Sequence, residues 1–161
     1  MKKILSLTLA LAMIGTILTG CGSKDAATKT PAENTQQEQS QTEKALALIN
    51  TFATGDTDTA RSLLADGYIQ HNLAYGTGAD AFVGSVEYLA SADVKTTVNN
   101  IRAFEDGDKV FLQTIYNFAG AGEQVAFDIF RFDENGKIAE HWDVMETIAD
   151  QSTWQNQNGK F

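Results

Sequence analysis

The sequence predicts an α+β domain in which helices pack on one face of a curved antiparallel sheet. The first observation is a set of apolar residues at helical spacing between residues 45 and 90. The second is that the chain beyond Val94 consists of extended segments separated by turn sequences typical of hairpins. A long sheet with helices on one side curls around them, so polar residues facing that side would line a cavity.

Three helices are expected from the spacing of their apolar residues. The first covers residues 45–53 and ends near Gly55, and the second begins at Asp56 or Thr57. The third covers about residues 79–90, after a segment without helical spacing at residues 68–75. The apolar residues that define these helices are Ala45, Leu46, Leu48, Ile49, Phe52, Ala53, Ala60, Leu63, Leu64, Phe82, Val83, Val86 and Leu89.

Four strands are expected after the third helix. Helices followed by a meander of strands are typical of an α+β domain with an antiparallel sheet. The turns that separate these strands contain glycine, which accepts the backbone conformations that tight hairpins require. They are Asp106-Gly107, Gly120-Ala121-Gly122 and Glu134-Asn135-Gly136.

The last two strands, within Phe127–Glu146, carry the candidate site. Successive side chains of a strand point to opposite faces, so alternate residues form a row. Ionisable groups at alternate positions among apolar ones predict a pocket rather than a solvated face. The two rows are Asp128, Phe130 and Phe132 on one strand, and Ala139, His141, Asp143 and Met145 on the next.

The opposite face of these strands would carry Phe127, Ile129, Arg131 and Trp142. Three of these four side chains are apolar or aromatic, and they would leave a hydrophobic area exposed to solvent. Such an area favours a homodimer formed through the sheet.

The N-terminal segment has the pattern of a secretory signal peptide over residues 1–20. Two basic residues, Lys2 and Lys3, precede an apolar run that is too short to span a bilayer stably. Residues 18–21, Leu-Thr-Gly-Cys, resemble the lipobox of bacterial lipoproteins. Cys21, the only cysteine, would then be acylated, palmitate included, and would anchor the protein outside the cytoplasm to the bacterial cell membrane. A simple secretory signal with a chance cysteine is the alternative.

Residues 21–41 are expected to be a disordered tether that begins at the lipidated Cys21. This segment consists mainly of small and polar residues and contains the only proline, Pro31. The remaining residues, 42–161, are enough for one domain with its own core. The chain has 21 acidic and 12 basic residues and a net charge of −9, which argues against nucleic acid as a partner.

Two strings resemble the SnoaL-like domain of the nuclear transport factor 2-like superfamily. They are YIQHN at Tyr68–Asn72 and DIFRFDENGKIAEHWDV at Asp128–Val144, and the resemblance covers roughly residues 43–161. The tail NQNGKF also resembles the end of SnoaL-like enzymes of the aldol-condensation type, although they usually have proline where this chain has Leu73. The resemblance implies a cone-shaped curved sheet with three helices packed on its concave face around an apolar pocket. It also implies cofactor-free enzymes such as cyclases, isomerases, dehydratases and epoxide hydrolases, beside members without known activity.

The resemblance to ketosteroid isomerases within this superfamily places Asp128 at the aspartate of the oxyanion hole and His71 at the general base. Leu48 stands where those enzymes have a tyrosine on the first helix. The resemblance also turns the row of His141 and Asp143 toward the pocket. The epoxide hydrolases share an acid at Asp143, but their Arg and Asp partners have no counterpart in residues 110–118.

A mechanism follows from these placements. His71 would take a proton next to a substrate carbonyl, and Asp128, kept protonated by burial among phenylalanines, would donate a hydrogen bond to the oxyanion. His141 and Asp143 would act as a second acid/base pair or would orient the substrate. Further contacts to a small apolar or carbonyl-containing ligand are expected from Asn72, Tyr116, Phe130 and Met145.

Other interpretations remain open at this point. His71 could be a polar residue at the pocket rim, Asp128 could form a structural ion pair with a histidine, and the pair His141 and Asp143 could be exposed. The whole domain could be a tethered module that binds a small ligand or docks a partner protein without catalysis. A metal site from His71, His141 and Asp143 lacks any short ligand spacing, so neither metal nor cofactor is expected.

Overall fold

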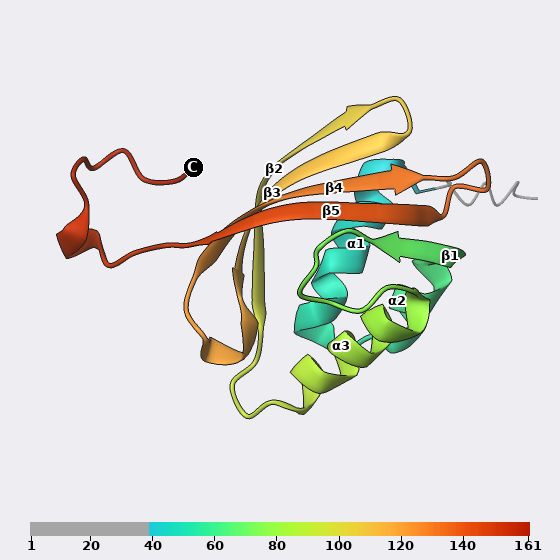
Figure 1. Cartoon of the computed structure of the whole chain (residues 1–161), viewed down its shortest axis with the longest axis horizontal. Helices are drawn as coiled ribbons and strands as arrows, with labels where there is room; N and C mark the ends of the chain where they lie inside the picture. Colours follow the sequence, from blue (N-terminus) through green and yellow to red (C-terminus); the bar gives the residue numbers. More distant parts are fainter. Residues whose placement is uncertain (1–38) are drawn as a thin grey trace, which may run out of the picture. The chain divides into compact units, whose positions relative to one another are not determined.

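The computed structural model describes residues 39–161. The expected signal peptide at residues 1–20, Cys21 and nearly all of the expected tether at residues 21–41 lie outside this range. The described residues contain three α-helices and five strands (Figure 1). No helix among them is long and apolar enough to cross a membrane.

The three predicted helices are present as α1 (Gln41–Thr54), α2 (Thr57–Leu63) and α3 (Ala79–Ser91). α1 begins with a capping box in which Ser40 and Glu43 exchange side-chain to backbone hydrogen bonds. It ends at Gly55, whose φ of 74° is left-handed and where a Cβ atom would lie 2.8 Å from Ala90 of α3. Glycine therefore both ends α1 and lets α3 approach closely.

The sheet has five strands, one more than the sequence predicted. The expected four are β2 (Thr97–Asp106), β3 (Lys109–Asn117), β4 (Gln124–Phe132) and β5 (Ile138–Thr147). The additional strand is β1 (Leu64–Gln70), which starts at a residue that we expected to belong to α2. β1 is short and pairs in parallel with β5. It contains Asp66 and Gly67, which are uncommon in strands, and its apolar residues do not alternate regularly, so its sequence did not identify it as a strand.

The strand order is β1-β5-β4-β3-β2, and every pair except β1 with β5 is antiparallel. The helices lie together on one side of this curved sheet (Figure 1). The predicted α+β fold with helices on the concave face is therefore confirmed. The core between the two layers includes Leu48, Val86, Leu112, Phe130 and Ile138, each at most 2% exposed.

The outer face of the sheet is partly apolar, as the alternation in β4 and β5 predicted. Phe127 is 55% exposed and lies opposite Val144, which is 71% exposed. Gln113 and Ile115 share this face of β3 but are buried, and Gln113 donates a hydrogen bond to the carbonyl of Lys160 in the C-terminal tail. The homodimer through this face stays a prediction.

Between β3 and β4 the chain forms a single 3-10 turn, η1 (Phe118–Gly120), and a second one, η2 (Gln151–Thr153), follows β5. Residues of η1 reach the space between the sheet and the helices. The rim of the cavity is thus built by the β3–β4 connection together with α3.

Candidate functional site

A cavity of about 610 Å³ lies between the inner face of the sheet and helices α1 and α3. This volume is within the range of small-molecule sites in proteins, about 300–1,000 Å³. Its wall is largely aromatic, and its polar end is formed by Asp128, His141 and Asp143. The aromatic residues of the wall are Phe52, Tyr68, Tyr75, Phe82, Tyr88, Tyr116, Phe118 and Phe130.

The polar end comes from neighbouring positions of β4 and β5. Asp128 lies directly opposite Asp143 in the strand register, and Phe130 lies opposite His141. The rings of Phe130 and His141 stack, with centroids 4.4 Å apart and planes at 9°. The rows predicted from alternation therefore face the cavity together, and Met145 continues the row along the wall.

Asp128 is buried, with 3% of its surface exposed, and both of its oxygens have partners. The hydroxyl of Tyr116 donates to Oδ2 over 3.0 Å, and His141 Nε2 lies 3.2 Å from Oδ1. Burial, followed by the charge of Asp128, raises the pKa of Tyr116 well above its ordinary value. Tyr116 therefore stays protonated and donates a hydrogen bond to Asp128.

The hydrogen bonds of Gln70 determine which ring nitrogen of neutral His141 carries the proton. The backbone N–H of Asn72 can only donate, so the amide atom 2.9 Å from it must be Gln70 Oε1. The other amide atom, Nε2, lies 2.9 Å from His141 Nδ1 and can only donate. Nδ1 consequently accepts, and the ring proton of the neutral histidine resides on Nε2, where it is donated to Asp128.

This network revises the role that the sequence suggested for Asp128. Two donors point at its carboxyl group, so Asp128 acts as a hydrogen-bond acceptor and carries the negative charge. The expected protonated carboxyl that donates to an oxyanion is not compatible with these contacts. The contact with His141 agrees with the alternative left open from the sequence, a pair between Asp128 and a histidine, and the strand register sets which residues are its partners.

Asp143 has a different environment from Asp128, although the two face each other. It is partly buried, and Asn72 Nδ2 donates to its Oδ1 over 2.6 Å. Within residues 39–161 this is the only hydrogen bond to its carboxyl group. Burial raises the pKa of Asp143, and the charge of Asp128 adds to this, whereas His141 and Asn72 oppose it.

Tyr68 is a site residue that the sequence analysis did not select. It is 2% exposed, and its hydroxyl oxygen accepts a hydrogen bond from Gln70 Nε2 over 3.3 Å. Burial, followed by the charges of Asp143 and Asp128, raises its pKa, so the phenol stays protonated. No acceptor among residues 39–161 takes its hydrogen. The alternation of Tyr68, Gln70 and Asn72 along YIQHN would have revealed it, had this segment been identified as a strand.

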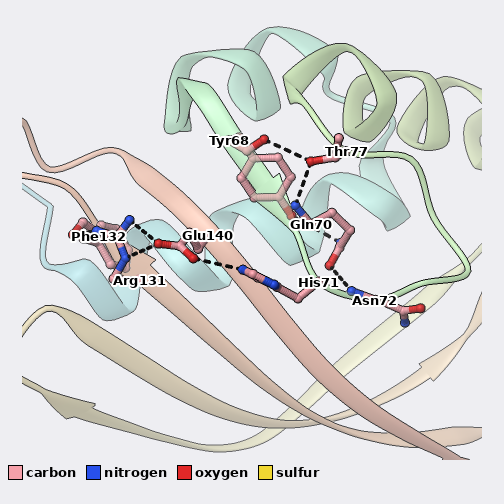
Figure 2. Close-up of polar contacts among 8 residues, drawn as sticks. All are labelled: Tyr68, Gln70, His71, Asn72, Thr77, Arg131, Phe132 and Glu140. Carbon is pink, nitrogen blue, oxygen red and sulfur yellow. Dashed lines mark hydrogen bonds and ion pairs between the residues drawn. The ribbon is translucent and has the colours of Figure 1, made fainter.

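His71 does not join the other predicted site residues. It leaves β1 on the outer face of the sheet, where its Nε2 lies 2.9 Å from Glu140 and its ring stacks on Trp142 at 4.4 Å. Figure 2 shows Gln70 and His71 pointing in different directions, with Gln70 toward Tyr68 and Asn72 and His71 toward Glu140. The expectation that His71 faces the pocket is therefore wrong by one position of the strand.

Glu140 links His71 to Arg131 on the same outer face (Figure 2). Arg131 Nε donates to Glu140 Oε1 over 2.7 Å, and a second guanidinium nitrogen makes a close ion pair with the same oxygen. The hydrogen bond from His71, followed by that from Arg131, lowers the pKa of Glu140. This cluster holds the end of β1 to β5 from outside the cavity.

The four residues expected to contact a substrate are all near the cavity. Tyr116, Phe130 and Met145 line it directly. Asn72 reaches it through its hydrogen bond to Asp143. The first helix contributes Ile49 and Phe52 to the wall, whereas Leu48 is fully buried in the core.

The cluster of Asp128, His141 and Asp143 also offers three metal-ligand atoms within 4.8 Å of one another. This set differs from the one considered from sequence, because it contains Asp128 in place of His71. A metal on His141 Nε2 would need the proton to move to Nδ1, which faces the amide donor of Gln70. The hydrogen bonds around His141 therefore disfavour metal coordination.

A family model of the SnoaL-like domain matches residues 45–141 of this chain. No curated protein matches it. Among solved structures, an NTF2-like protein of unknown function from Cytophaga hutchinsonii is 16% identical with a TM-score of 0.59, covering 69% of this chain and 94% of its own. An LEH-like epoxide hydrolase from M. tuberculosis is 18% identical with a TM-score of 0.58, covering 66% and 82%. Wild-type IdmH, a candidate polyketide cyclase from Streptomyces antibioticus, is 18% identical with a TM-score of 0.54, covering 67% and 93%.

At these identities the solved structures establish a shared fold. The family model covers more than half of the chain and includes most of the cavity. The protein therefore belongs to the SnoaL-like domain family, with an NTF2-like fold.

Proposed function

We propose that this protein catalyses proton transfer on a small carbonyl compound without a cofactor, in a reaction of the isomerase, cyclase, aldol or dehydratase type. The observation that carries the proposal is the contrast between two facing carboxyl groups. Asp128 has two donors, whereas Asp143 has one and faces the cavity. A carboxylate that is partly desolvated is a stronger base than one in water.

In this proposal Asp143 accepts a proton from the carbon next to the carbonyl. The electron pair of the broken C–H bond moves onto the carbonyl oxygen, and Asp143 becomes a neutral carboxylic acid. Tyr68 donates its free hydroxyl hydrogen to that oxygen, which stabilises the developing charge. In an isomerisation the proton then returns from Asp143 to another carbon, and in a dehydration it goes to the hydroxyl oxygen that leaves as water. In an aldol step or cyclisation the enolate carbon first forms a bond to a second carbonyl carbon, whose π electrons move onto its oxygen, and the proton goes to that new alkoxide.

The remaining polar residues would position these two groups. His141 has both ring nitrogens engaged, with Gln70 and with Asp128, so it has no free nitrogen for a substrate. Asp128 keeps a fixed negative charge opposite Asp143, which raises the proton affinity of the base. His141, Asp128, Tyr116 and Gln70 are thus positioning residues.

The proposal includes an extracytoplasmic location, with the protein anchored to the bacterial cell membrane through a lipid on Cys21. It is supported by the basic start, the apolar run and the Leu-Thr-Gly-Cys sequence at residues 18–21. The catalytic proposal does not depend on it.

Hydrogen–deuterium exchange tests the chemistry without knowledge of the natural substrate. The full chain in detergent is incubated with 2-tetralone in D₂O, and loss of the α-proton signals is followed by NMR. We expect exchange above the buffer rate, with a decrease of about 100-fold or more in Asp143→Asn. Tyr68→Phe should lower the rate by about 10- to 1,000-fold.

His71→Ala is the matched control, because sequence resemblance alone would make His71 the base. We expect it to retain exchange, since His71 lies on the outer face. Exchange that survives Asp143→Asn, or that disappears in His71→Ala while the fold is retained, would refute the proposal.

A ligand-binding module without catalysis is the second candidate function, and the aromatic wall of the cavity supports it. Tight binding of 2-tetralone without any exchange above the buffer rate would favour this alternative.

A further inference from the structure

The charges around the cavity are of one sign. Among the described residues that line it, two carry carboxyl groups, Asp128 and Asp143, and none is lysine or arginine. Both ring nitrogens of His141 are engaged, by Gln70 and by Asp128, so His141 offers no free donor to a ligand anion. The polar end therefore contains two carboxyl groups and no lysine or arginine to offset them, which favours a negative potential.

Several basic residues of the domain are engaged elsewhere. Arg131 pairs with Glu140 on the outer face, and Lys160 pairs with Glu146. Arg61 pairs with Asp80, and Lys95 donates to carbonyls at the end of α3. A ligand anion in the cavity would consequently face carboxylates without a basic partner, at a high desolvation penalty.

Asp143 is the carboxylate that could accept a ligand cation. Both oxygens of Asp128 are occupied by donors from the protein, whereas one oxygen of Asp143 has no donor among residues 39–161. A positively charged nitrogen at this oxygen would form a charge-assisted hydrogen bond in a partly desolvated site.

The aromatic wall suits the same kind of ligand. Tyr75 and Tyr88 are 50% and 74% exposed, and both line the cavity with Phe52, Phe82 and Phe118 farther along the wall. The faces of aromatic rings attract cations and pack well against apolar ring systems. The wall and the carboxylate thus favour an apolar body that carries a cationic group.

We propose that the cavity is selective for protonated amines with an aromatic or alicyclic body, and that it rejects organic anions of the same shape. The ammonium group binds Asp143, and the ring system packs against the aromatic wall. This inference rests on the proposed function only in that it places the ligand in the same cavity. An amine bound in this way competes with a carbonyl substrate, because both require Asp143.

Three probes of one shape test the selectivity by isothermal titration at pH 7 with the full chain in detergent. They are 1-naphthylmethylamine, 1-naphthalenemethanol and 1-naphthoate, which carry a positive charge, no charge and a negative charge. We expect the amine to bind at least about tenfold more tightly than the alcohol, as a charge-assisted hydrogen bond implies, and the carboxylate to bind most weakly.

Asp143→Asn should remove the advantage of the amine over the alcohol and change the affinity for the alcohol by less than about threefold. Glu146→Gln is the matched control, because it removes one negative charge from β5 on the outer face. It should leave the order of affinities unchanged. Equal binding of amine and alcohol, or loss of the preference in Glu146→Gln, would overturn the proposal.

The outcome is separate from that of the exchange experiment. Amine selectivity without exchange would support the proposed ligand class and refute catalysis. Exchange without amine selectivity would support catalysis and refute the proposed ligand class. Where both hold, the amine should inhibit exchange competitively.

Discussion

The two aspartates that face each other across β4 and β5 should respond to the same substitution with opposite changes in stability. Asp128 and Asp143 are directly opposite in register, so two like charges oppose each other at neutral pH. Like charges at such positions destabilise a sheet by an amount comparable to the 0.2–1 kcal/mol of a favourable pair. Asp143→Asn removes this repulsion and keeps a carbonyl oxygen that can accept from Asn72. We expect it to raise the free energy of unfolding by about 0.5–1 kcal/mol at pH 7.

Asp128→Asn should have the opposite effect. Its carboxylate accepts from Tyr116 and from His141 Nε2, and the amide that replaces it has only one acceptor oxygen. The second donor would then lie buried without a charged partner. Hydrogen bonds to charged groups contribute roughly 1.5–3 kcal/mol, so we expect a loss of about 1–3 kcal/mol.

The pH dependence separates the effect of the charge on Asp143, through burial and repulsion together, from other effects of Asp143→Asn. Burial and Asp128 raise the pKa of Asp143 in the folded protein above its unfolded value. The folded state therefore binds this proton more tightly, and the resulting stabilisation is complete below the unfolded pKa and lost as the pH rises through the folded pKa. The advantage of Asp143→Asn over the native chain should consequently be present at pH 7 and should vanish near pH 3.5.

Urea denaturation followed by tryptophan fluorescence measures the free energy of unfolding of the native chain and of both variants, at pH 7 and near pH 3.5. Trp142 lies in the sheet and Trp154 in the tail, so both report on the described domain. A destabilising effect of Asp143→Asn at pH 7 would refute the reasoning, because it would mean that this carboxylate supports the fold. A neutral effect of Asp128→Asn would show that the buried network is not formed.

Three further predictions concern other parts of the chain. Gln70→Glu removes the donor at His141 Nδ1, so the imidazole ¹⁵N chemical shifts should show Nδ1 protonated; unchanged shifts would contradict the assigned tautomer. Tyr116→Phe should lower stability by about 1.5–3 kcal/mol in the same urea experiment, since it leaves one oxygen of Asp128 without a donor; a loss below about 0.5 kcal/mol would count against the bond. Cys21→Ala should release the protein from the membrane fraction into the medium, whereas continued retention would exclude the lipid anchor.

The sequence predicted the β4–β5 row well because alternation in these strands is regular. Asp128 and Phe130 are buried and Phe127 is exposed, as a period of two requires. A hairpin turn with Gly136 in a left-handed conformation connects the strands, and its composition was recognisable. Where period and turn are both local, residue order was enough to put His141 and Asp143 in one row, and the family resemblance indicated that this row faces the pocket.

The sequence did not show which side chains of β1 face the cavity, because its residues do not alternate regularly between apolar and polar. Without an identified strand, YIQHN gives no indication whether Gln70 or His71 points inward. The answer comes from pairing with β5, in which Gln70 lies opposite His141. These partners are 71 residues apart, so the contact that decides the protonation of His141 is set by tertiary structure.

The tertiary structure also decides which phenol group of the cavity is available to a substrate. Leu48 stands where the resemblance to ketosteroid isomerases would put a helical tyrosine, and it is buried in the core. The strands nevertheless bring two tyrosines to the cavity, Tyr116 from β3 and Tyr68 from β1. The first is committed to Asp128, and the hydrogen of the second is free. The capacity to stabilise an oxyanion therefore follows from which hydroxyl has an acceptor within the protein, and not from which helix or strand carries a tyrosine.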